Sequence, residues 1–150
     1  MNRHLSRMVA MQTIYEWNFR PETDLSEILE RGIAEFSPDI DKDFVKKVVF
    51  GIKDKKNQID KAIADCAPEW PIEQISCIDK SILEIAIYEL LNALDIPPKV
   101  SINEAVELAK QFGSENSSKF INGVLGTVYE KHQKEIEKKE GKNAGKNPAV

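Results

Sequence analysis

The apolar residues of this chain recur at three- and four-residue steps, the spacing that places side chains on one face of an α-helix. The first such series spans residues 5–19 and ends before Pro21. A second spans residues 25–36, and Asp24 with Glu27 forms a D-x-x-E start for it. Each series predicts one amphipathic helix.

The middle of the chain continues the same pattern and becomes more apolar. A third series runs from Asp41 to Ile63 and predicts one long helix, after which Pro68 and Pro71 mark a tight connection. Residues 77–94, "CIDKSILEIAIYELLNAL", are apolar nearly all round. A helix of that kind is surrounded by other helices, so we expect it at the centre of a bundle.

Two further segments complete the pattern. In residues 101–113, Ser101 and Glu104 form an S-x-x-E capping box, and Gly113 is placed to end the helix in the left-handed conformation. The chain shows neither a strand pattern nor a repeat of fixed period. The sequence therefore predicts an all-α bundle of about seven helices.

The last apolar segment contains Asn122-Gly123, a pair typical of β-hairpin turns. A hairpin there would leave only about three residues for its first strand, which is short for a strand. The apolar positions between 120 and 128 instead keep helical spacing, so we predict a helix. Gly123 and Gly126 each cost about 1 kcal/mol in a helix. Close approach of another helix is the favoured explanation, and approach of a ligand backbone is the alternative.

Composition supports one globular domain. The chain has 150 residues, of which 41% are hydrophobic and 31% charged. Its net charge of -4 argues against uniform, charge-driven binding of nucleic acid but allows a local basic patch. Cys66 and Cys77 form no C-x-x-C motif, which is typical of reduced thiols in a cytoplasmic protein. No apolar run approaches a membrane span, and the N-terminal segment is interpreted as a mature helix.

Motifs of enzyme chemistry are absent from the sequence. It contains no phosphate-binding loop, dinucleotide fingerprint or zinc-protease motif, and His4 and His132 lie at opposite ends of the chain. We therefore predict no catalytic site, no cofactor and no metal. Glu84 and Glu89 interrupt the most apolar helix. They would need partners if buried, and the favoured interpretation places them at its edge.

Two groups of cations suggest binding. Arg3 and Arg7 lie four residues apart on one helical face, with His4 beside them. Lys110 and Lys119 flank the start of the last helix, where backbone N–H groups favour a phosphate. A solvated surface would explain either pattern on its own.

Several blocks of the sequence resemble the NusB family of bacterial transcription antitermination factors. The most specific are "DIPPKVSINEAVELAKQFG" and "SSKFINGVL", and "AIYEL" and "EWPIEQISCIDKSIL" also match. Arg7, Ala10 and "TIYEW" extend the resemblance into the first helix. The resemblance implies a NusB-like fold of two small helical subdomains over residues 1–132, followed by a charged, disordered tail over residues 133–150.

The resemblance also implies a function without catalysis. Proteins of this family bind single-stranded boxA RNA together with the ribosomal protein NusE, in complexes that keep RNA polymerase elongating, notably on ribosomal RNA operons. The residues that correspond to the family's RNA site are Arg3, His4, Arg7, Tyr15, Lys119 and Phe120. Those that correspond to its NusE surface are Glu73 and Asp79. The cations would neutralise phosphates and the aromatic rings would stack on bases.

Two alternatives belong to other classes. One is the helical part of an RNA cytosine methyltransferase, which the absence of a Gly-rich cofactor loop and of a catalytic Cys motif disfavours. The other is a protein-interaction or homodimeric module with little RNA affinity, which the net negative charge favours. The chain also departs from the family at Glu84, where Arg is frequent, and at Gly126, where a polar or acidic residue is frequent.

Overall fold

A computed structural model describes residues 2–67, 74–92 and 95–138. Within these ranges the chain is helical and contains no strand, as the sequence predicts. No helix of the described residues is long and apolar enough to cross a membrane. The helices are α1 (Arg3–Phe19), α2 (Leu25–Phe36), α3 (Lys42–Asp54), α4 (Lys56–Cys66), α5 (Cys77–Asn92), α6 (Pro98–Phe112) and α7 (Ser117–Lys131).

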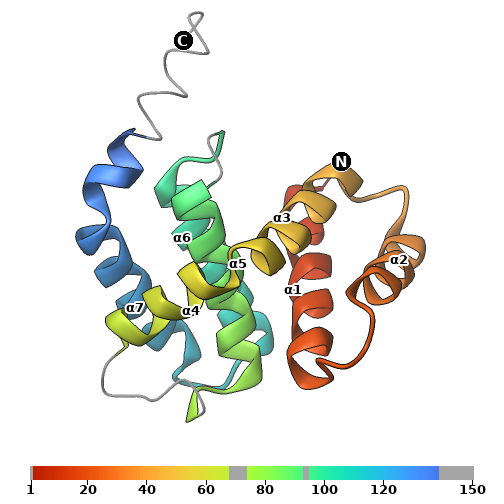
Figure 1. The fold of residues 1–150 in the computed structure, drawn as a ribbon, viewed down its shortest axis with the longest axis horizontal. Coiled ribbons are helices and arrows are strands. Elements are labelled where there is room, and N and C mark those ends of the chain that lie inside the picture. The colour runs from red at the N-terminus through yellow and green to blue at the C-terminus, as the bar shows by residue number, and fades with distance from the viewer. Residues whose placement is uncertain (1, 68–73, 93–94, 139–150) are drawn as a thin grey trace, which may run out of the picture.

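The helices form two groups that share α5 (Figure 1). In the first group, α1 packs against α2 and α3, and in the second, α7 packs against α4 and α6. Helix α5 contacts both groups, and eleven of its sixteen residues are buried. This confirms the predicted central position of the most apolar segment.

Short polar side chains determine where the early helices begin. The Asn2 side chain accepts a hydrogen bond from the Leu5 backbone N–H at 2.9 Å, and Asp24 accepts one from Ser26 at 3.1 Å. Asp41 does the same for Phe44 at 3.1 Å. These bonds satisfy backbone donors that have no partner inside the helix.

The predicted long third helix is two helices. Lys55 ends α3 and begins α4, with its backbone N–H bonded to the Gly51 carbonyl and its own carbonyl bonded to Ile59. The apolar series continues through the break, since Ile52 and Ile59 are both fully buried. The change of direction lets α3 pack in the first group and α4 in the second.

Helix α6 begins four residues earlier than its capping motif predicts, with Pro97 rather than Ser101 as the N-cap. Pro98 occupies the first helical position, where a missing N–H costs nothing. Ser101 therefore lies inside the helix, where its hydroxyl donates a hydrogen bond to Glu89. The Glu104 carboxylate bonds to His4 and does not cap the helix. Gly113 ends α6 with φ of −89°, which is not the left-handed conformation that the sequence predicts.

The last helix is confirmed, and helical structure continues past it. Residues 133–138, part of the predicted disordered tail, form a further helical stretch. Ile136 in that stretch is fully buried and belongs to the hydrophobic core. Residues 139–150 lie outside the described residues.

Candidate functional site

The N-terminus of α1 places Arg3 at the surface. Its side chain is 43% exposed and its guanidinium lies 3.3 Å from the Asp41 carboxylate. The same guanidinium stacks 4.2 Å from the centre of the Phe44 ring. Exposed ion pairs of this kind are worth little, so Arg3 is oriented by its neighbours and remains able to bind an anion.

His4 connects α1 to α6. Its ring nitrogens lie 2.8 Å from the Glu104 carboxylate and 3.0 Å from the Gln111 side-chain oxygen. The hydrogen bond to Glu104 raises the pKa of His4 above its ordinary value, despite an opposing effect of burial. His4 therefore keeps its proton to higher pH, but the charge faces a carboxylate.

Arg7 does not reach the surface, contrary to its predicted contact with RNA. Its side chain is 4% exposed and forms a two-pronged bond with Glu89, at 2.9 and 3.0 Å. Ser101 donates a further hydrogen bond to Glu89 at 2.9 Å. The sequence feature that indicates this buried ion pair is Glu89 itself. A carboxylate buried in an apolar helix requires a cation from a neighbouring helix.

Glu84 is buried as well, so the edge position favoured from the sequence is wrong for both glutamates. The Asn18 amide donates to its carboxylate at 2.6 Å, and the Lys56 ammonium lies 3.5 Å away. Burial raises the pKa of Glu84, and Lys56 and Asn18 counteract that rise only in part. The cluster joins α1, α4 and α5.

The outer face of α7 is open. Lys119, Asn122, Gly123 and Gly126 are exposed on it, whereas Phe120 is partly buried and packs against the core. A methyl group placed on either glycine would meet no atom of the described chain within 4 Å. The favoured explanation of Gly123, close approach of another helix, is therefore wrong within the described part of the chain.

Tyr15 lies at the opposite end of α1 from Arg3. The two are twelve residues apart, about 18 Å along a helix. Tyr15 stacks on Phe19 with ring centroids 6.3 Å apart, and its carbonyl accepts a bond from the Cys77 thiol at 3.8 Å. The structure thus places Tyr15 near the start of α5, rather than with the cations.

The start of α5 also carries Asp79, a residue predicted to contact a partner. Asp79 is 8% exposed, and one of its carboxylate oxygens is buried without a hydrogen-bond partner among the described residues. Phe19, which stacks on Tyr15, is 66% exposed, and no sequence motif marks it as a surface residue. Glu73, the other predicted partner residue, lies outside the described residues.

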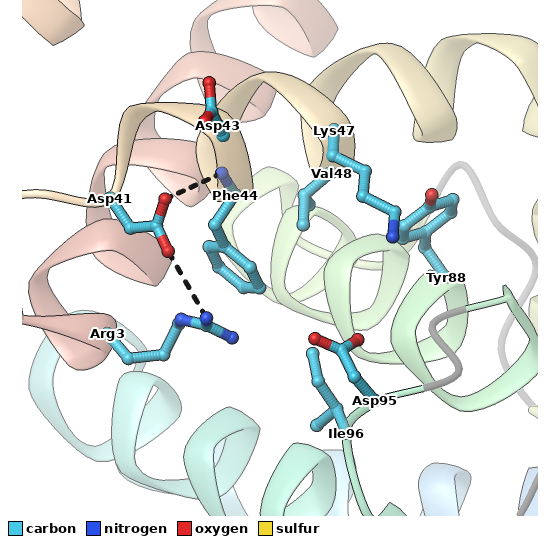
Figure 2. Close-up of a pocket in the computed structure, with 9 residues that line it drawn as sticks. All are labelled: Arg3, Asp41, Asp43, Phe44, Lys47, Val48, Tyr88, Asp95 and Ile96. Atoms are coloured by element: carbon cyan, nitrogen blue, oxygen red, sulfur yellow. Dashed lines mark hydrogen bonds and ion pairs between the residues drawn. The ribbon is translucent and has the colours of Figure 1, made fainter. Parts of the chain in front are cut away.

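A pocket of about 380 Å³ opens beside Arg3, between the N-terminus of α3, the end of α5 and the connection to α6. Figure 2 shows the Arg3 guanidinium and the Asp95 carboxylate directed into it from different sides. Its apolar surface includes Phe44, Tyr88 and Ile96. No sequence motif indicates this pocket, because its lining comes from four separate segments.

Within the described residues, no group of three His, Cys, Asp or Glu side chains is placed to hold a metal ion. The features that stand out are surfaces: exposed cations on α1 and α7, an open glycine face, and the exposed Phe19 ring stacked on a partly buried Tyr15. Fold and surfaces together define a two-subdomain helical binding protein.

Comparison with known proteins identifies the family. The model of the NusB family matches residues 4–130, and the chain belongs to that family. It is 41% identical over 143 residues to the transcription antitermination protein NusB of Chloroflexus aggregans, covering 92% of this chain and 93% of that protein. The NusB protein of Roseiflexus castenholzii is 40% identical over 133 residues, covering 87% of this chain and 94% of that protein.

Solved structures agree with the fold. A structure of T. maritima NusB superimposes with a TM-score of 0.82 at 33% identity, covering 91% of this chain and 98% of that chain. A chain from a crystal structure of the antitermination factors NusB and NusE in complex with dsRNA gives a TM-score of 0.76 at 23% identity. That match covers 84% of this chain and 94% of the other, and at this identity it supports the fold alone.

Proposed function

We propose that this protein is a cytoplasmic transcription antitermination factor that binds single-stranded boxA-type RNA together with NusE. In this role it supports processive elongation by RNA polymerase, notably on ribosomal RNA operons, and it carries no catalytic activity. The observation that carries the proposal is the family match over residues 4–130. The exposed cations on α1 and α7 supply a surface on which RNA can bind.

The proposed RNA surface combines Arg3, His4 and Lys119 with the open face of α7. Arg3 and Lys119 are exposed cations, and His4 adds a proton-dependent charge. Gly123 and Gly126 leave room for a sugar–phosphate backbone to approach α7 closely. Arg7 supports this surface from inside, because its pair with Glu89 fixes α1 against α5.

The proposed NusE surface lies at the other end of α1. Tyr15 and Phe19 form a stacked pair there, and Phe19 is largely exposed. Exposed aromatic residues are enriched at protein–protein interfaces. Asp79, in the first turn of α5, is the acidic residue that the family resemblance assigns to this surface, although its side chain is largely buried. This division assigns Tyr15 to the protein partner rather than to RNA.

The proposal is tested by fluorescence anisotropy with a labelled boxA-like strand, at two salt concentrations, with and without NusE. We expect weak binding of RNA alone, and tighter binding when NusE is present. Lys119→Ala should weaken RNA binding several-fold, whereas Lys53→Ala on α3, a matched loss of one exposed cation, should have little effect. If NusE neither binds the chain nor tightens its RNA binding, the proposed function is wrong.

A second candidate function is a protein-interaction or homodimeric module with little RNA affinity. The exposed Phe19 ring, stacked on the partly buried Tyr15, favours it, because such a surface could equally meet another copy of the chain. Sedimentation velocity over a range of concentrations distinguishes the two functions. Self-association that Phe19→Ser abolishes, together with absent RNA binding, would support this alternative.

A further inference from the structure

The pocket beside Arg3 has buried apolar side chains at its base and charged side chains around its opening, which we call its rim. Its apolar base consists of Phe44, Tyr88 and Ile96, each of which is less than a tenth exposed. Its volume of about 380 Å³ lies within the range of about 300–1,000 Å³ that is typical of small-ligand sites. The pocket is therefore large enough for a flat heterocycle.

The rim carries charges that the protein itself does not neutralise. Among the described residues, neither the Lys47 ammonium nor the Asp95 carboxylate forms an ion pair or a side-chain hydrogen bond. Both side chains line the pocket, with the Asp95 carboxylate directed into it (Figure 2). The lining also includes Asp43 and the Arg3–Asp41 ion pair. The rim thus offers carboxylate acceptors together with the Lys47 ammonium and the Arg3 guanidinium, a combination that suits a ligand with both N–H groups and acceptor atoms.

A nucleobase has that combination on a flat apolar ring. Arg3 both lines the pocket and belongs to the proposed RNA surface, so a strand bound to that surface passes the pocket mouth. Bases of single-stranded RNA are commonly unstacked by proteins and read along their hydrogen-bonding edges. Because the acceptor here is a carboxylate, the preferred base is one that presents two adjacent N–H donors.

We propose that this pocket receives one unstacked guanine of the bound RNA, with Asp95 accepting hydrogen bonds from its N1–H and 2-amino groups. The inference rests on the proposed function, since it deepens the RNA site. Lys47 and Arg3 lie where they can donate to the guanine O6 atom or to the adjoining phosphates. Adenine and uracil lack the paired donors, and cytosine presents only one amino group.

The test uses a set of boxA-like strands in which each guanine in turn is replaced by inosine, which lacks the 2-amino group. For the wild-type protein with NusE, one replacement should weaken binding about tenfold, the order expected for a lost base-edge contact. In Asp95→Asn that penalty should disappear, because the amide cannot accept both bonds. Asp95 is exposed, so the variant should fold normally, as circular dichroism will verify.

Glu30→Gln on α2 is the control, since it makes the same charge change at an exposed position away from the pocket. It should keep the full inosine penalty. The inference is overturned if RNA binds but no inosine replacement weakens its binding. It is also overturned if Asp95→Asn still binds the inosine strand more weakly than the guanine strand, or if Asp95→Asn changes the affinity for all strands, guanine and inosine alike, by the same factor. Absence of any RNA binding, by contrast, would contradict the proposed function itself.

Discussion

Arg7 and Glu89 show how a charge can be buried at tolerable cost. Burial removes the hydration of both ions, so their attraction must be supplemented by well-placed hydrogen bonds. Glu89 accepts hydrogen bonds from two nitrogens of Arg7 and from the Ser101 hydroxyl, so α1, α5 and α6 all contribute to the site. The three helices are thereby fixed relative to one another behind the proposed RNA surface.

Arg7→Met should reduce the free energy of unfolding by about 3–5 kcal/mol, because it leaves the Glu89 carboxylate buried without its cation. Combining it with Glu89→Leu should recover most of the loss, since neither charge of the pair then remains buried. Urea denaturation followed by circular dichroism measures both. Arg31→Met, which removes an exposed pair with Glu16, is the control and should leave the midpoint nearly unchanged. A double variant no more stable than the single one would contradict this account.

Glu84 should make stability depend on pH. Its pKa in the folded protein is raised above the ordinary value of 4.5 by burial. The folded state therefore binds a proton that the unfolded state releases, and this contribution to stability is lost as pH rises through the folded-state pKa. Glu84→Gln mimics the protonated side chain. Its stability relative to wild type should increase from pH 4.5 to pH 8 in urea titrations, and a constant difference would show that Glu84 does not titrate in this range.

At the scale of helices, the periodicity of apolar residues was sufficient to predict a helix where one face of that helix packs on one neighbour. It predicted α1, α2 and α7, and it resolved the Asn122-Gly123 pair as helical. It failed at Lys55, because the apolar series continues unbroken while the helix changes direction between subdomains. The start of α6 was missed because the fixed φ of Pro98 competes with the capping motif, and Ser101 is drawn to Glu89.

The candidate site was less predictable than the fold. Spacing placed Arg3 and Arg7 on one helical face, but the depth of each side chain depends on α5, which is distant in sequence. The family resemblance groups Tyr15 with the cations, although about 18 Å of helix separates it from Arg3. The pocket around Asp95 required the packing of α1, α3 and α5 to be known.

Two glycines in helices should respond oppositely to alanine. A methyl group on Gly51 would overlap the Tyr88 ring, which is itself buried, so Gly51→Ala should destabilise the protein by about 1–3 kcal/mol. Gly126→Ala meets open space and should stabilise it by up to about 1 kcal/mol through helix propensity. Thermal unfolding of the two variants compares them directly. Equal effects would mean that the α3–α5 contact is not as close as the structure indicates.

At the scale of the molecule, the net charge of -4 limits how strongly RNA can bind without help. If Arg3 and Lys119 are the main phosphate contacts, the logarithm of the RNA association constant should fall against the logarithm of salt concentration with a slope of about −1.4, or about −0.7 for each contact to a single strand. Anisotropy titrations at four salt concentrations measure this slope. Lys119→Ala should bring it closer to zero by about half, and an unchanged slope would exclude Lys119 from the contacts.

Ile136 determines how far the protein can be shortened. The family match ends at residue 130 and the sequence favours a boundary at residue 132, yet the Ile136 side chain completes the core four residues later. A version cut after residue 132 would leave a hole where that side chain was, and its melting temperature should fall by several degrees. One cut after residue 138 should melt like the full chain. The minimal unit for crystallisation or for fusion to another protein therefore extends through the short helical stretch after α7.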